Sequence, residues 1–94
     1  MNLSPNDKEL LRRIDEILHY LWDPIGVAGV PQARDEYKNY VPQVFRLLKA
    51  TADGKDVVEY LHWLSGEHMG MGACPDRNAE VVDMLIAWRD HLAA

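Results

Sequence analysis

The chain has 94 residues, of which 48% are hydrophobic and 27% are charged, as in ordinary globular domains. This length predicts a single domain over residues 1–94 with one modest core. Ten Lys and Arg against fifteen Asp and Glu give a net charge of -5. Such a surface repels phosphate backbones, which argues against nucleic acid and favours a basic protein as the partner.

The single cysteine, Cys74, excludes an internal disulfide and favours a reducing cytoplasm. The first eight residues contain no basic stretch followed by an apolar core, so we expect no secretion signal. No apolar run approaches the roughly 20 residues that a membrane-crossing helix needs. The sequence therefore predicts a cytoplasmic protein with no membrane association.

The Ser4-Pro5 pair predicts the start of a first helix, because Ser is a good N-cap and Pro is favoured at the first helical position. We expect this helix to run to about Leu21, with Pro24 enforcing its end. At 100° per residue, its apolar positions form one arc, and its polar positions form the other side. The apolar arc is Leu10, Leu11, Ile14, Ile17, Leu18, Leu21 and Trp22, and the other side is Arg12, Arg13, Glu16, His19 and Tyr20.

Residues 23–31 have the proline and glycine content of a loop, and residues 32–39 have a helical pattern. Pro42 interrupts that pattern, because it lacks an amide donor. Either a new helix begins at Pro42 or one longer helix kinks there. In both cases the expected buried positions are Val41, Val44, Phe45 and Leu48.

Residues 51–55 predict a turn in which Gly54 takes a positive φ. The third helix is expected over residues 55–67, with Trp63 and Glu59 nearly opposite its apolar stripe of Val57, Val58, Leu61 and Leu64.

Glycines end that helix, and Pro75 or Asn78 starts a last helix that runs to about Leu92. Its broad apolar arc predicts the most enclosed helix of the molecule. The fold predicted is therefore all-α, a small antiparallel bundle of four to five helices.

Arg89 lies inside the apolar arc of the last helix, where an unpaired charge would be costly. We expect Asp23 to pair with it, because Asp23 stands where the chain first folds back. Together with Trp22, Pro24 and Gly26, these residues predict a structural bracket that docks the first helix onto the last.

The best metal candidates are His62, Glu67, His68 and Cys74, all of ligand types that zinc accepts. Their spacing argues against a site, because His62 and His68 are six residues apart and do not share a helix face. Catalysis by Cys74 with a histidine would need a pocket and an orienting group that nothing in the sequence provides. We therefore predict no catalytic residues, no metal and no cofactor.

Amphipathic aromatic side chains favour a protein-binding surface instead. Tyr40 and Trp63 are the better exposed candidates, whereas Tyr37 projects onto the core stripe. With Asp35 and Glu36 they predict an acidic helical face that binds and occludes a basic protein. One alternative is a self-associating regulatory or structural bundle, a homo-oligomer that buries Trp63 between protomers. Another is a small enzyme or metal-dependent protein that uses Cys74 and His68.

Several short motifs are specific in combination: Leu-Trp-Asp-Pro-Ile-Gly-Val at residues 21–27, Asp-Glu-Tyr at 35–37, Tyr-Val-Pro at 40–42, Leu-Leu at 47–48 and Glu-His-Met-Gly-Met at 67–71. Over residues 10–71 the chain resembles the YugE-like family of small bacterial helical proteins of unknown function. The resemblance implies an all-α bundle and supplies no reaction. Short proteins of this style are also similar to immunity proteins of bacterial toxin systems, which is an analogy at the level of fold.

Overall fold

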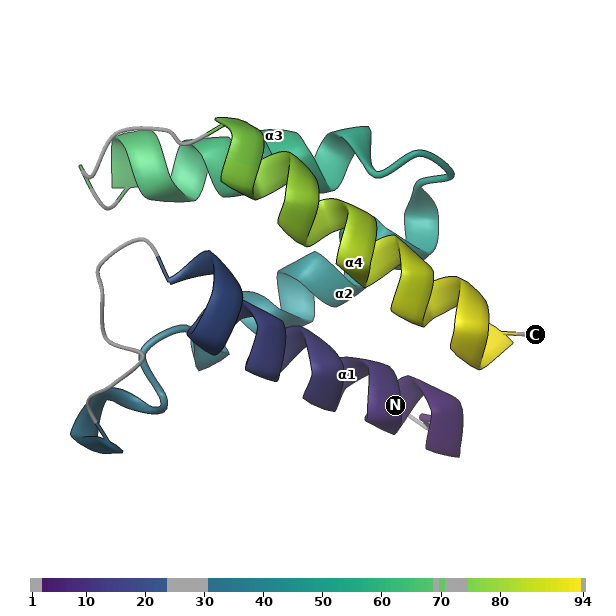
Figure 1. Ribbon diagram of the computed structural model, residues 1–94. Coiled ribbons are helices and arrows are strands. Elements are labelled where there is room, and N and C mark those ends of the chain that lie inside the picture. Colours follow the sequence, from purple (N-terminus) through teal and green to yellow (C-terminus); the bar gives the residue numbers. More distant parts are fainter. Residues whose placement is uncertain (1–2, 24–30, 69, 71–74, 94) are drawn as a thin grey trace.

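The computed structural model describes residues 3–23, 31–68, 70 and 75–93, and within these ranges every regular element is helical. The predicted all-α bundle is confirmed. Its four α-helices are α1 (Pro5–Ile17), α2 (Val41–Ala50), α3 (Lys55–Trp63) and α4 (Pro75–Ala93) (Figure 1). Turns of π-helix extend two of them, η1 (Leu18–Trp22) after α1 and η4 (Leu64–His68) after α3.

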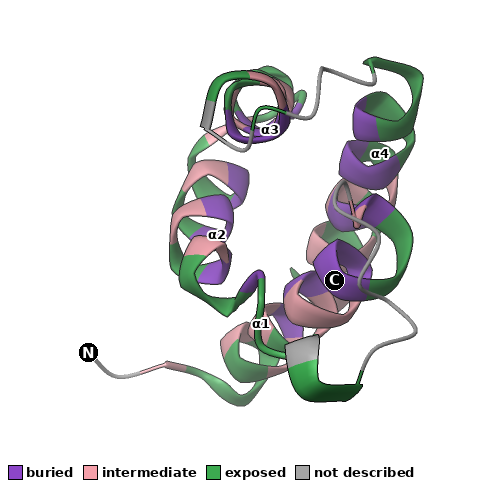
Figure 2. Cartoon of the chain, turned by 90° about the vertical axis from the view of Figure 1, so that its left-hand side faces the viewer, coloured by how far each residue is buried: buried purple, intermediate pink, exposed green. Residues whose placement is uncertain are grey.

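The helices surround one core, with α1 and α3 each packed against both α2 and α4 (Figure 2). Helices α1 and α4 run antiparallel, because Asn6 at the start of α1 donates to the Leu92 carbonyl and Trp22 bonds to Asn78. No helix in the described ranges is long and apolar enough to cross a membrane. The fully buried core residues are Ile14, Leu18, Trp22, Tyr37, Val44, Leu48, Val57, Leu61, Leu64, Val81, Val82 and Leu85.

The start of α1 confirms the predicted cap, since the Ser4 hydroxyl accepts from the Asp7 amide at 3.0 Å. Its end differs from the prediction. His19, expected on the polar side, is only 2% exposed, whereas Leu21, expected in the core, is 49% exposed. Residues Leu18 to Trp22 form the π-turn η1, to which the spacing of 100° per residue used in the prediction does not apply.

The segment before α2 is not the helix predicted for residues 32–39. It consists of two short 3-10 turns, Pro31–Ala33 and Lys38–Tyr40, joined by a non-helical turn. Tyr37 is 1% exposed and packs edge-on against Trp22, with ring centroids 5.4 Å apart, so its predicted packing role is confirmed. Pro42 lies in the first turn of α2, where a missing amide donor costs nothing. A new helix therefore begins at Val41, and the alternative of one longer helix kinked at Pro42 is wrong.

The turn into α3 brings two helices close together. Gly54 has φ +78°, as predicted, and a Cβ atom there would lie 2.6 Å from Val82 and 2.7 Å from Ile86. Any side chain here would strain the backbone angle and displace the Val82 and Ile86 side chains, which explains the glycine. Helix α3 with η4 spans residues 55–68, close to the expected range, and Trp63 and Glu59 are exposed as predicted.

Helix α4 has the predicted length, but it is not the most enclosed helix. Its buried positions are confined to one side, at Asn78, Val81, Val82 and Leu85. Trp88, expected within the core arc, is only partly buried. The reason is that α4 closes the bundle from one side, and no described element covers its outer face (Figure 2).

The predicted pairing of Arg89 with Asp23 is wrong. The Arg89 guanidinium donates to the carbonyls of Leu48 at 2.7 Å and Thr51 at 2.6 Å, and its Nε contacts the Asp90 carboxylate at 3.0 Å. The Asp23 carboxylate accepts from the Tyr37 hydroxyl at 2.7 Å. Antiparallel packing places Asp23 beside the beginning of α4, whereas Arg89 stands near its end. Two other bracket residues, Pro24 and Gly26, lie outside the described ranges.

Candidate protein-binding surface

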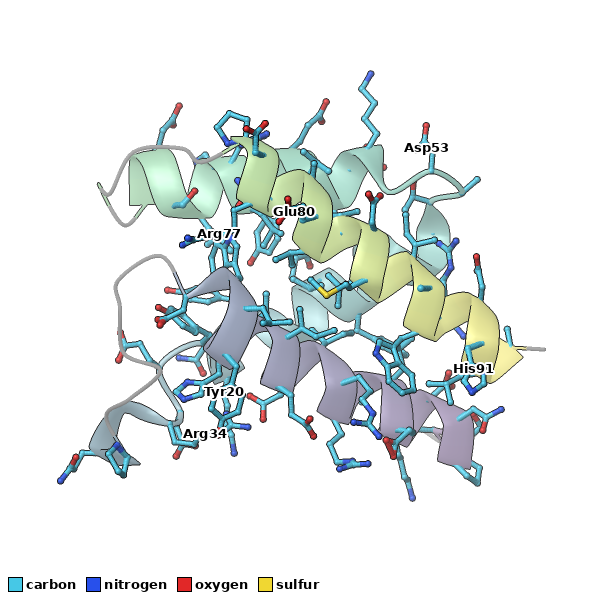
Figure 3. All side chains as sticks on the ribbon, viewed as in Figure 1. Tyr20, Arg34, Asp53, Arg77, Glu80 and His91 are labelled. Atoms are coloured by element: carbon cyan, nitrogen blue, oxygen red, sulfur yellow. The ribbon has the colours of Figure 1, made fainter. Side chains whose placement is uncertain are left out.

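Asp35 and Glu36 are exposed, but their surroundings are not strongly acidic. The Asp35 carboxylate pairs with Lys38 at 3.2 Å. Next to it, Arg34 bonds to Asp15 at 3.0 Å and lies over the Tyr20 ring, and Figure 3 shows Arg34 and Tyr20 together on the α1 side. The hydrogen bond and charge of Asp15 raise the pKa of Arg34. Each of these charges except that of Glu36 therefore has a partner of opposite sign.

Trp63 lies on α3, in the opposite half of the bundle. Its ring stacks with that of Tyr60, with centroids 6.3 Å apart and planes inclined by 17°. Burial raises the pKa of Tyr60, and the Tyr40 and Arg46 side chains also act electrostatically on its hydroxyl. Tyr60 therefore extends the exposed aromatic area of Trp63. Tyr60 was not among the binding residues predicted from the sequence. Its spacing of three residues from Trp63 nevertheless makes the two side chains neighbours on the helix surface.

The outward side of α3 combines Trp63 with two carboxylates. Asp56, Glu59 and Trp63 are all exposed, and Trp63 has a relative exposure of 47%. Their spacing of three and four residues places them on one helix face, opposite the buried Val57 and Leu61. The structure thus places an exposed aromatic side chain beside two negative charges.

The negative charge of the protein is unevenly distributed along the chain. Residues 53–83 contain seven carboxylates and two cationic side chains, which leaves five negative charges, equal to the net charge of the whole chain. The remaining residues contain eight of each sign and are neutral together. Counting charge by segment would have pointed to this half of the molecule from the sequence alone.

Ion pairing follows the same division. In the α1–α2 half, Asp7, Glu9, Asp15, Glu16 and Asp35 all pair with Lys or Arg side chains, whereas Glu36 makes no ion pair with a described residue. In the α3–α4 half, no carboxylate of residues 55–83 makes an ion pair within the described part of the chain. We call these carboxylates the acidic group: Asp56, Glu59 and Glu67 on α3 and η4, and Asp76, Glu80 and Asp83 on α4, all of them exposed.

The candidate metal residues do not form a site among the described residues. His62 Nδ1 hydrogen-bonds the Asn78 side-chain amide at 2.9 Å, a contact between α3 and α4. Among the residues that the structure describes, no three His, Cys, Asp or Glu side chains are grouped so that they could hold a metal ion. Cys74 and the side chain of His68 lie outside that part, so the predicted alternative that uses them stays a prediction.

Comparisons with protein-family models, with curated proteins and with solved structures found no match to this chain.

Proposed function

We propose that the protein is a non-enzymatic, cytoplasmic protein-binding module of the inhibitor or immunity type, which binds a basic protein and occludes its active surface. The observation that supports this most directly is the acidic group, six exposed carboxylates without an ion pair among the described residues, in the segment that holds the net charge of the chain. Membership of the YugE-like family is part of the proposal, and the resemblance over residues 10–71 supports it.

The chemistry of α3 favours a protein partner. Interfaces typically combine large aromatic side chains, which contribute most of the affinity, with charged groups that steer the partner and select it. Trp63 and Tyr60 supply the aromatic area, and Asp56 and Glu59 supply negative charge on the same side of the helix. The binding residues proposed are therefore Asp56, Glu59, Tyr60 and Trp63, with Tyr40 at the edge of the group.

Asp35 and Glu36, the other predicted binding residues, provide a matched comparison. They are exposed and adjacent, yet they lie in the half of the chain whose charges balance. A double reversal there changes the total charge by the same amount as a double reversal on α3. A difference in binding between these two variants therefore depends on where the interface lies, because their total charge is the same.

The test is affinity capture from a lysate of the source organism with three immobilised proteins: the unaltered chain, Asp56→Lys/Glu59→Lys and Asp35→Lys/Glu36→Lys. We expect the unaltered chain and the Asp35→Lys/Glu36→Lys protein to retain the same basic protein, and the α3 variant to lose it. Retention should also weaken as the salt concentration rises, because the contact is electrostatic. Equal retention by all three proteins, or no basic protein retained by any, would reject the proposal.

A further inference from the structure

The two ends of α3 are attached to α4 in different ways. Just before its first turn, Gly54 lies close to the Val82 and Ile86 side chains, an apolar contact. Near its other end, the partly buried His62 hydrogen-bonds through Nδ1 to the Asn78 side-chain amide at 2.9 Å. The first attachment does not depend on protonation. The second depends on which ring nitrogen of His62 carries a proton.

The direction of the second attachment is fixed by Trp22. Its indole Nε1 can only donate, and it lies 2.8 Å from Asn78 Oδ1. The oxygen of Asn78 therefore faces Trp22, and its Nδ2 amide faces His62. Because that amide nitrogen can only donate, His62 Nδ1 has to accept. This arrangement requires a neutral imidazole with its proton on Nε2.

A protonated His62 would not fit this hydrogen-bond relay. It would carry a hydrogen on Nδ1, which would meet the N–H of Asn78. Turning the Asn78 amide over would offer its oxygen to His62, but its N–H would then meet the N–H of Trp22. Both Trp22 and Asn78 are buried, so a donor left over between them is costly.

The side chains around this end of α3 do not compensate for a charge on His62. The charged or titratable ones are Glu59, Tyr60 and Glu67 on α3 and η4, Asp76, Arg77 and Glu80 on α4, Arg46 and Lys49 on α2, and His19 and Asp23 in and after η1. Within the described part of the chain, none of them makes a hydrogen bond or an ion pair with His62. A proton on His62 would therefore gain no carboxylate partner.

We propose that the Trp22–Asn78–His62 relay is a pH-sensitive switch, which attaches this end of α3 to α4 and η1 while His62 is neutral and weakens when His62 gains a proton. The unfolded chain places no such demand on the imidazole, so it takes up the proton more readily than the folded chain. The relay therefore contributes stability above the ordinary pKa of histidine, about 6.5, and this contribution decreases as the pH falls below that value.

The switch lies next to the proposed binding surface, because Glu59 and Trp63 are three residues before His62 and one residue after it on α3. The inference does not depend on the proposed function. It concerns the pH dependence of folding, which can be measured without a partner.

The test is urea denaturation of the unaltered chain and of His62→Asn at pH 7.5 and pH 5.5, followed by circular dichroism. Asn can offer an amide oxygen to Asn78 in place of Nδ1, and it cannot titrate. Between the two pH values, the folding equilibrium constant of the unaltered chain should fall about tenfold more than that of His62→Asn. His91→Asn, at an exposed histidine, is the matched control and should keep the full pH dependence. An equal change in the unaltered chain and His62→Asn would overturn the proposal.

Asn78→Asp tests the direction of the hydrogen bonds. A carboxylate accepts from Trp22 and also from a protonated His62, so this variant should favour the proton that the unaltered chain disfavours. Its folding equilibrium constant should therefore fall much less than that of the unaltered chain from pH 7.5 to pH 5.5, or should rise. An equally steep fall in both proteins would contradict the relay.

The tautomer can be measured in the unaltered folded chain. Long-range ¹H–¹⁵N correlation spectra at pH 7.5 should show His62 with Nδ1 unprotonated and the proton on Nε2. A proton on Nδ1 at this pH would overturn the proposal, whatever the stability of the variants.

Discussion

The Trp22 indole donates a hydrogen bond from Nε1 to the Asn78 Oδ1 atom at 2.8 Å, between residues that are both 1% exposed. This bond fixes the orientation of the Asn78 amide, because only the oxygen can accept. The amide nitrogen therefore donates to His62 Nδ1 at 2.9 Å. One buried side chain thus joins the end of the first helix, the beginning of the last and the face of α3.

Replacing Asn78 with Ala should lower the free energy of unfolding by about 2–3 kcal/mol. The loss arises because the buried Trp22 N–H is left without a partner, which costs more than the bond itself contributes. Urea denaturation followed by Trp fluorescence measures the change. Asn39→Ala, at an exposed position, is the control and should change stability by less than about 0.5 kcal/mol. Equal effects of the two variants would contradict the role assigned to Asn78.

Arg89 should contribute to stability through its contacts with the end of α2. Arg89→Met retains the aliphatic stem but removes the donors to the Leu48 and Thr51 carbonyls, so we expect a loss of about 1–3 kcal/mol. Arg89→Lys should recover only part of it, because one ammonium cannot reproduce a fork of donors. Thermal unfolding measures both variants, with the exposed Arg46→Met as control. A fully stable Arg89→Met protein would show that these hydrogen bonds contribute nothing net.

Two glycines allow backbone strain to be separated from steric contact. Gly54 (φ +78°) and Gly70 (φ +69°) have similar backbone angles, but a Cβ at Gly54 meets Val82 and Ile86, whereas one at Gly70 meets nothing within 4 Å. Gly70→Ala should therefore cost only about 1 kcal/mol, from the backbone angle. Gly54→Ala should cost about 2–4 kcal/mol, because its Cβ also forces the Val82 and Ile86 side chains to shift. Comparable melting temperatures for the two variants would refute the close helix contact.

Stability should fall as the pH drops through the acidic range, and Asp53 should contribute to this fall. Hydrogen bonds from the Lys55 amide and the Thr51 hydroxyl lower the pKa of the Asp53 carboxyl. A carboxyl whose pKa is lower in the folded state stabilises the protein above its ordinary pKa of about 4, and this contribution disappears as the pH falls through the lower folded value. Melting temperatures between pH 6 and pH 2 measure it.

The control for this prediction is Asp53→Asn, which keeps an acceptor for the Lys55 amide but cannot titrate. Its melting temperature should fall less steeply on acidification than that of the unaltered chain. Parallel curves for the two proteins would show that Asp53 is not responsible.

Features that depend on neighbouring residues were predictable from the sequence. The Ser4 cap, the turn at Gly54, the buried stripe of α2 and the limits of α4 follow from torsion preferences and from helical periodicity, which act over a few residues. The exposure of Glu59 and Trp63 follows from the same periodicity. The location of the net charge in residues 53–83 was also present in the sequence, but only a count by segment shows it.

Features that depend on which helix ends meet were decided only by the tertiary structure. Arg89 is satisfied by α2 carbonyls and not by Asp23, because antiparallel packing sets those two residues at opposite ends of α4. His19 is buried and Leu21 is exposed within the π-turn η1, whose last residue, Trp22, contacts Asn78 and Tyr37. Helical periodicity specifies which side of a helix is apolar. Long-range packing decides which side chains of the other helices lie against that side.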